Sequence, residues 1–149
     1  MPVEPGLVDA NVLAYASNAD DSKFAASRAL PEEARSPLTT LYITPQIITE
    51  FYSVITNPRR VAVPSSPAVA LQAISALLVL PGISLLPING RAVAALVELL
   101  RHHPVTGPDV FDLQVVATMK ANGIQTIYTF NAADFEVFQD LTVIVPGAF

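Results

Sequence analysis

The stretch FDLQVVATMKANGIQTIYTFNAADFEVF, residues 111–138, carries the strongest indications of how this chain folds. Asp112 opens a run that predicts a helix over residues 112–121, and Asn122-Gly123 is a favourable end for that helix. The β-branched and aromatic residues 126–130 then predict a strand. We therefore expect a helix headed by an acid that turns directly into a strand.

Elsewhere the chain keeps alternating between strand and helix patterns. Leu7 and Val8 form a short apolar run before Asp9, which predicts a buried strand with Asp9 at its carboxyl end. Thr44 supplies a capping hydroxyl and Pro45 suits the first helical position, so a helix is predicted from there to residues 57–58. The other predicted helices are 22–34, 67–80 and 90–101, and the other predicted strands are 41–43, 83–88 and 141–145.

This alternation predicts an α/β fold, a three-layer α/β/α arrangement around a central, mostly parallel sheet. The length of 149 residues suits one domain, residues 1–149, with a single core. Hydrophobic residues make up 52% and charged residues 14%, which argues against disorder. No apolar run is long enough to cross a membrane, and residues 1–6 lack the basic charge of a signal peptide. We therefore expect a cytoplasmic location and no membrane contact.

Composition also limits the chemistry of a site. The absence of cysteine excludes disulfides, zinc–thiolate sites and thiol nucleophiles, so a metal ion would need oxygen ligands or the imidazoles of His102 and His103. These histidines have the character of a solvated helix end, and we assign no site to them. The net charge of −5 opposes non-specific nucleic-acid binding, although a metal ion supplies positive charge locally.

Four acids lie within or beside apolar runs, where water is normally excluded: Asp9, Glu50, Asp109 and Asp112. An unpaired carboxylate in such a place costs several kcal/mol, and the chain has only 8 Lys and Arg residues to pair with its acids. Asp9 and Asn131 both follow predicted strands, and ligands of parallel sheets bind at the carboxyl ends of strands. A shared Mg²⁺ or Mn²⁺ ion is the economical explanation, because these hard cations prefer carboxylates and water.

Each acid also has a simpler interpretation. Asp9 suits a turn, and Glu50 can reach solvent from the flank of its helix. Asp109 and Asp112 suit the capping of a helix start, and Asp134 suits the capping of a short helical segment. Only the joint placement of these residues favours a metal site.

Four segments together resemble the PIN-domain ribonucleases, and specifically the VapC-type toxins of bacterial and archaeal toxin–antitoxin pairs. They are LVDANVLAY (7–15), PQIITEFYSVITNPRR (45–60), the stretch 111–138 quoted above, and VIVP (143–146). The stretch 111–138 is the most specific of them. Residues 65–106 match only in their helical character.

The resemblance implies metal-dependent hydrolysis of RNA, with Asp9, Glu50 and Asp112 as the catalytic acids that bind Mg²⁺ or Mn²⁺. The family pattern often has a fourth acid just after the Thr of the last long strand, and here Asn131 stands there. Its amide oxygen can coordinate a cation or position a water but carries no charge. Asp134, three residues later, is the acid that can compensate as a further catalytic group.

The resemblance also suggests supporting roles and partners. Asn11, Thr129 and Asp109 are expected to orient the carboxylates. Arg59 and Arg60 are the best local candidates for contacts with RNA phosphates, although a solvated helix end is the simpler interpretation of both. A small cognate antitoxin of the VapB type and a second copy of the chain are the expected protein partners.

Two other functions are compatible with the sequence. A haloacid-dehalogenase-like phosphatase also has an Asp after its first strand, but that chemistry needs a second acid where Asn11 stands. A catalytically inactive PIN-like module that binds RNA or a partner is the other alternative, since the fourth acid is missing and the net charge is negative.

Overall fold

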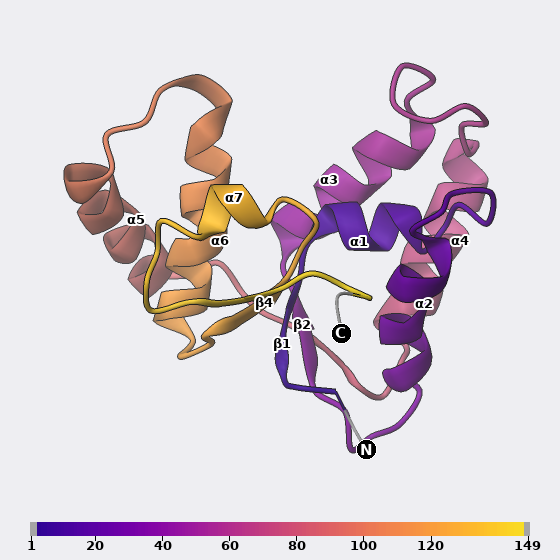
Figure 1. Ribbon diagram of the computed structural model, residues 1–149, viewed down its shortest axis with the longest axis horizontal. Helices are drawn as coiled ribbons and strands as arrows, with labels where there is room; N and C mark the ends of the chain where they lie inside the picture. Colours follow the sequence, from indigo (N-terminus) through magenta and orange to yellow (C-terminus); the bar gives the residue numbers. More distant parts are fainter. Residues whose placement is uncertain (1–2, 148–149) are drawn as a thin grey trace.

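A five-stranded sheet runs through the centre of the molecule (Figure 1). The structure is a computed structural model that describes residues 3–147. The strand order is β3-β2-β1-β4-β5, and every neighbouring pair is parallel. The strands are β1 (Gly6–Val8), β2 (Leu41–Ile43), β3 (Ile83–Leu85), β4 (Thr126–Tyr128) and β5 (Thr142–Ile144). The predicted α/β class is confirmed, and the sheet is parallel throughout rather than mostly so.

Helices cover both faces of this sheet, which confirms the three layers (Figure 1). Helices α1 to α4 gather on one side, whereas α5 packs against α6 on the other. A short 3-10 turn (Gly107–Asp109) leads into α6. The helices are α1 (Ala10–Tyr15), α2 (Phe24–Glu33), α3 (Pro45–Thr56), α4 (Pro67–Leu78), α5 (Gly90–His102), α6 (Val110–Ala121) and α7 (Ala132–Phe135). Among the residues described, no helix is both long and apolar enough to cross a bilayer.

The ends of helices and strands agree with the prediction at the start of α3 and differ from it at the end of β3 and the start of α6. Thr44 caps α3 as predicted, with its hydroxyl accepting a hydrogen bond from the Ile47 amide at 3.1 Å. Strand β3 is shorter than predicted and stops before Pro87, which has no amide hydrogen to donate to a ladder. Helix α6 begins at Val110, earlier than predicted, because the 3-10 turn continues directly into it.

The centre of the sheet is its most buried part, and it positions the site. All residues of β1 and β4 are buried. These two strands pair closely: a Cβ added at Gly6 would lie 2.9 Å from the Thr126 carbonyl oxygen. Because β1 and β4 are parallel neighbours, the residues that follow them, Asp9 and Thr129, leave the sheet side by side.

Candidate active site

Asp9 is held at the end of β1 by three hydrogen bonds. Its Oδ1 accepts from the Ala10 amide at 2.8 Å, at the start of α1. Its Oδ2 accepts from the Thr129 hydroxyl at 2.8 Å and from the side-chain amide (Nδ2) of Asn11 at 3.2 Å. Asp9 is only 7% exposed and Thr129 is fully buried, so this carboxylate has a fixed orientation.

Asn11 links the two sides of this network. Its Nδ2 also lies 3.2 Å from the Thr129 hydroxyl, and its Oδ1 accepts from the Phe130 amide at 3.1 Å. The Asn131 amide in turn donates to the Thr129 hydroxyl at 3.1 Å. The structure thus places Asn11 and Thr129 in contact with Asp9, as expected for residues that orient it.

The charged form of Asp9 is disfavoured even so. Burial raises the pKa of the Asp9 carboxyl, and the charge of Asp134 raises it further. The bonds from Thr129, Ala10 and Asn11 lower the pKa without offsetting the effect of burial. A nearby positive charge would therefore favour the ionised carboxylate.

Glu50 reaches the site from α3 and is partly buried. Gln46, one turn earlier, donates through Nε2 to Glu50 Oε1 at 2.8 Å and to the Phe111 carbonyl oxygen at 3.2 Å. Gln46 therefore ties Glu50 to the start of α6. The sequence analysis missed Gln46, although its spacing of four residues from Glu50 on a helix is a usable signal.

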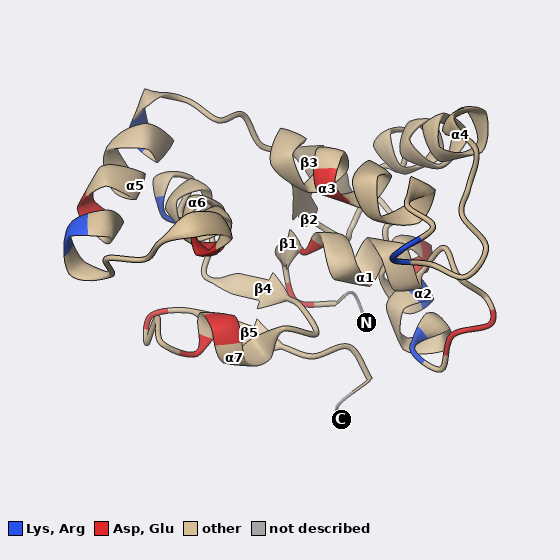
Figure 2. Cartoon of the chain, turned by 90° about the horizontal axis from the view of Figure 1, so that it is seen from above, with Lys and Arg blue, Asp and Glu red and all other residues tan. Residues whose placement is uncertain are grey.

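Asp112 lies in the first turn of α6 and faces other carboxylates. Its pKa is raised to about 6, first by burial and then by the charges of Asp134, Asp9, Glu50 and Asp109. Within residues 3–147, none of these five acids forms an ion pair with Lys, Arg or His. In Figure 2, red segments of α3, α6, α7 and the end of β1 lie around the centre, whereas most blue segments lie further out.

Two cavities meet at Asp112. One, of about 480 Å³, is lined by Asp9, Glu50, Asp112 and Asn131, among other residues. The other, of about 440 Å³, is lined by Asp109, Asp112 and Asp134 together with the two histidines. The predicted acids therefore fall into two groups. Asp9 and Glu50 line the larger cavity, Asp109 and Asp134 line the other, and Asp112 lines both.

The capping interpretations can now be judged. Asp9, for which the sequence suggested a turn, is instead the N-cap residue of α1, and its side chain accepts a hydrogen bond from the Ala10 backbone amide. Asp109 stands at the N-terminus of α6 without a capping hydrogen bond from its side chain. Asp134 lies within α7, whose N-cap position is Asn131. Asp109 therefore occupies the N-cap position without a capping hydrogen bond, and the capping interpretation is wrong for Asp134, which is not the N-cap residue.

The chemistry of the donors around the larger cavity suits a hard divalent cation, because they are carboxylate and amide oxygens. In the described part of the chain, none of these carboxylates forms an ion pair. A cation there would relieve the mutual repulsion that raises the pKa of Asp112. Nevertheless, residues 3–147 contain no group of three or more Asp, Glu or His side chains arranged to hold one ion. The acids line the cavity without forming a closed set of ligands.

Basic groups near the larger cavity are few. Arg60 lines it, whereas Arg59 does not. Tyr15 lines it as well, and the Lys23 ammonium lies 5.0 Å from the centre of the Tyr15 ring. Tyr15 makes an edge contact with Phe130, with ring centroids 5.2 Å apart. The sequence analysis missed Lys23, which nothing in its local pattern distinguishes.

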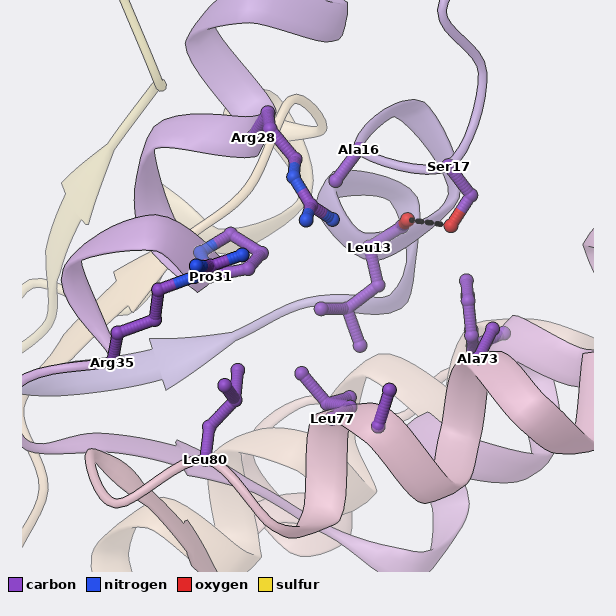
Figure 3. Close-up of a pocket in the computed structure, with 11 residues that line it drawn as sticks. Leu13, Ala16, Ser17, Arg28, Pro31, Arg35, Ala73, Leu77 and Leu80 are labelled. Carbon is purple, nitrogen blue, oxygen red and sulfur yellow. Dashed lines mark hydrogen bonds between the residues drawn. The ribbon is translucent and has the colours of Figure 1, made fainter.

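A further cavity, of about 190 Å³, lies between helices α1, α2, α3 and α4 (Figure 3). It is lined mainly by apolar residues, with Arg28 and Arg35 at its edge. Both arginines pair with Glu32, at 3.1 and 3.0 Å. None of the candidate acids contributes to this cavity, so it is separate from the site.

Comparison with known proteins agrees with this architecture. A family model described as PIN domain matches residues 6–140. Ribonuclease VapC43 of Mycobacterium tuberculosis is 34% identical over 110 residues, covering 74% of this chain and 75% of the relative. The crystal structure of M. tuberculosis VapC20, described as a sarcin-ricin loop cleaving toxin, superposes with a TM-score of 0.67 at 18% identity, covering 91% of this chain and 95% of that one.

A toxin–antitoxin complex from Klebsiella pneumoniae contains a chain with the same fold, with a TM-score of 0.62 at 16% identity and coverage of 97% and 99%. The match to the family model spans both strands that carry the site and every candidate acid. Together with the identity to VapC43, it shows that this chain belongs to the PIN-domain family and, within it, to the VapC ribonucleases.

Proposed function

We propose that this protein is an endoribonuclease, the toxin of a toxin–antitoxin pair, and that it hydrolyses RNA phosphodiester bonds with Mg²⁺ or Mn²⁺. The observation that carries the proposal is the group of Asp9, Glu50 and Asp112 around one cavity, none of which forms an ion pair with a basic side chain among residues 3–147. The cavity lies beyond the carboxyl ends of β1 and β4, where Asp9 and Asn131 line it, and ligands of parallel sheets bind at such ends. VapC43, the relative described above, is itself named a ribonuclease.

Asp9, Glu50 and Asp112 are the residues that would hold the cation, with Asn131 as a neutral oxygen donor beside them. When bound, the cation supplies the positive charge that stabilises the phosphate in the transition state and favours ionised water as the nucleophile. Because the three acids do not converge in the present arrangement, we infer that Glu50 and Asp112 adjust on binding. Asp9 stays in place through its hydrogen bonds.

The remaining polar residues have distinct tasks in this proposal. Thr129 and Asn11 fix the orientation of Asp9 through contacts of 2.8 and 3.2 Å. Asp112, with its pKa raised to about 6 by burial and by neighbouring acids, is largely ionised at neutral pH and so available to a cation. Asp134 and Asp109 act on Asp112 through their charge. Arg60 is the residue of the predicted arginine pair that lines the cavity and can contact a phosphate.

We further propose a cognate VapB-like antitoxin as the protein partner, formation of a homodimer, and a cytoplasmic location. The antitoxin rests on kinship with VapC proteins and on the fold shared with a chain of a toxin–antitoxin complex. The dimer and the location remain expectations. Co-purification with the product of a small neighbouring gene, and the mass of the isolated protein in solution, test the partner and the dimer.

The deciding experiment is cleavage of a labelled pool of total RNA by the purified protein with Mg²⁺, with Mn²⁺ and with EDTA. We expect discrete fragments that require the metal and that decrease by about a thousandfold in Asp9→Asn and in Asp112→Asn. Glu136→Gln is the matched control, because Glu136 is exposed and borders neither cavity.

Two results would contradict the proposal. RNA binding without turnover under every metal condition would favour the inactive PIN-like module. Cleavage that persists in both Asp variants would place the chemistry elsewhere. Membership of the PIN-domain family already argues against the phosphatase, and the lack of a second acid at Asn11 agrees with that conclusion.

A further inference from the structure

The site described above accounts for only one of the two cavities that meet at Asp112. The second cavity, of about 440 Å³, lies between the end of α5, the start of α6 and the region around α7. Its volume falls within the usual range for small-ligand sites, about 300–1,000 Å³. Because Asp112 borders both cavities, whatever occupies the second one lies directly beside the proposed point of cleavage.

The walls of the second cavity are largely apolar and aromatic. Val105, Leu113, Val137 and Phe138 contribute apolar surface. The imidazole of His103 lies against the Phe138 ring, with centroids 4.9 Å apart and the planes tilted by 59°. His103 as a whole is partly buried, and it lines the cavity. Such a supported ring is a suitable platform for a flat, uncharged group.

The charges of this cavity exclude an anion. Asp109, Asp112 and Asp134 all border it, and no Lys or Arg does. His102, the other imidazole, is turned toward Glu98, with Nε2 3.1 Å from Oε1. A phosphate would therefore be repelled, whereas the face of a nucleobase carries no net charge and can stack on an aromatic ring.

We propose that the second cavity receives a nucleobase of single-stranded RNA, next to the phosphate that is cleaved, and that this base stacks on His103. The inference rests on the proposed ribonuclease function and extends it to a residue that positions the RNA substrate. A substrate strand must continue on both sides of the cleaved bond, so the nucleotides flanking that bond need separate spaces. The larger cavity, with Arg60, suits the phosphate and the nucleotide on one side, and the second cavity suits the base on the other.

The test is a scan with abasic nucleotides. The cleavage site of the wild-type protein is first mapped, and short single-stranded RNAs spanning it are then made with one flanking base removed at a time. Their affinities are measured for Asp9→Asn, which blocks turnover, with and without His103→Ala. At one adjacent position we expect loss of the base to weaken binding about tenfold when His103 is present and to have no effect in His103→Ala.

Three further variants complete the scan. His103→Phe keeps an aromatic face and should retain the full effect of base removal. Val137→Trp should abolish the effect by filling the cavity, because Val137 is 59% exposed on its wall. Tyr52→Ala is the control, since Tyr52 is a comparably accessible aromatic residue, 36% exposed, that borders neither cavity. Melting temperatures establish that each variant is folded.

The outcomes separate the two proposals. If wild-type protein cleaves RNA and base removal costs the same with and without His103 at every flanking position, the inference is wrong and the ribonuclease function stands. If wild-type protein neither binds nor cleaves RNA, both fail. The inference is supported if removal of one flanking base weakens RNA binding in the presence of His103 and also in His103→Phe. The same removal should have no effect in His103→Ala or in Val137→Trp.

Discussion

The acid at the end of the sheet and the acids on the helices are held in opposite ways. Asp9 accepts hydrogen bonds from Ala10, Thr129 and Asn11, and it is almost completely buried. Glu50 accepts one side-chain hydrogen bond, from Gln46. The pKa of Asp112 is raised first by burial and then by the charges of other carboxylates. The difference suggests a division of labour, in which the sheet end fixes the geometry and the repelling acids supply the affinity for a cation.

Among changes that leave the acids themselves intact, the largest effect is expected from Thr129→Val, which loosens the hold on Asp9. This change keeps the shape but removes the hydroxyl that donates to Asp9 and accepts from the amides of Asn11 and Asn131. Because Thr129 is fully buried, water cannot replace it, and we expect a loss of about 1–3 kcal/mol in unfolding free energy. RNA cleavage should fall by about 10- to 100-fold, as for other groups that orient ligands of a metal.

Thr39→Val is the matched control for that variant. Thr39 is 2% exposed, and its hydroxyl has no hydrogen-bond partner within residues 3–147. The same substitution there should leave the unfolding free energy unchanged or higher, and cleavage unaffected. Denaturant titrations and initial rates measure both quantities. Equal effects of the two substitutions would show that Asp9 does not depend on Thr129.

The role of Asp112 among the acids that repel one another can be tested by measuring cleavage at lower pH. With its pKa raised to about 6, Asp112 is mostly ionised at pH 7 and mostly protonated at pH 5. A protonated carboxyl does not attract a cation, so the cleavage rate at subsaturating Mg²⁺ should fall about tenfold between these pH values. Higher Mg²⁺ should shift the midpoint to lower pH, because the cation competes with the proton. A rate that is constant from pH 7 to pH 5 would contradict the proposed role of Asp112.

The two sides of the site were not equally predictable from sequence. Asp9 and Asn131 follow strands, and the parallel topology alone brings such positions to one edge of the sheet. Glu50 and Asp112 carry helical patterns that place them near the same edge. Helix α1 was missed, because its six residues are apolar at positions that suit a strand as well as a helix.

The second cavity was beyond the reach of sequence patterns. His103 was assigned to a solvated helix end, and in the structure its ring packs on Phe138 instead. That contact joins the end of α5 to the segment after α7, and no local periodicity encodes a contact between such distant segments. The separation of Asp134 and Asp109 from Asp9 and Glu50 is hidden for the same reason, because it depends on which wall of a cavity each residue faces.

The smallest expected effect, and the sharpest test of the comparison, is a gain in stability from Asp112→Asn. The pKa of Asp112 in the folded protein, about 6, lies above its ordinary value of 3.8. Its ionisation therefore opposes folding, and the cost appears as the pH rises from about 4 through 6. Asp112 is partly exposed, so solvent screening reduces this cost to about 1 kcal/mol, equivalent to about 2–4 °C in melting temperature.

Without metal, the Asp112→Asn variant should melt at a higher temperature than wild type at pH 7.5 and at the same temperature at pH 4. Added Mg²⁺ should stabilise wild type more than the variant and so narrow the gap at pH 7.5. A variant that melts lower than wild type at pH 7.5 without metal would mean that Asp112 is held by favourable contacts, as Asp9 is, and the two sides of the site would not differ.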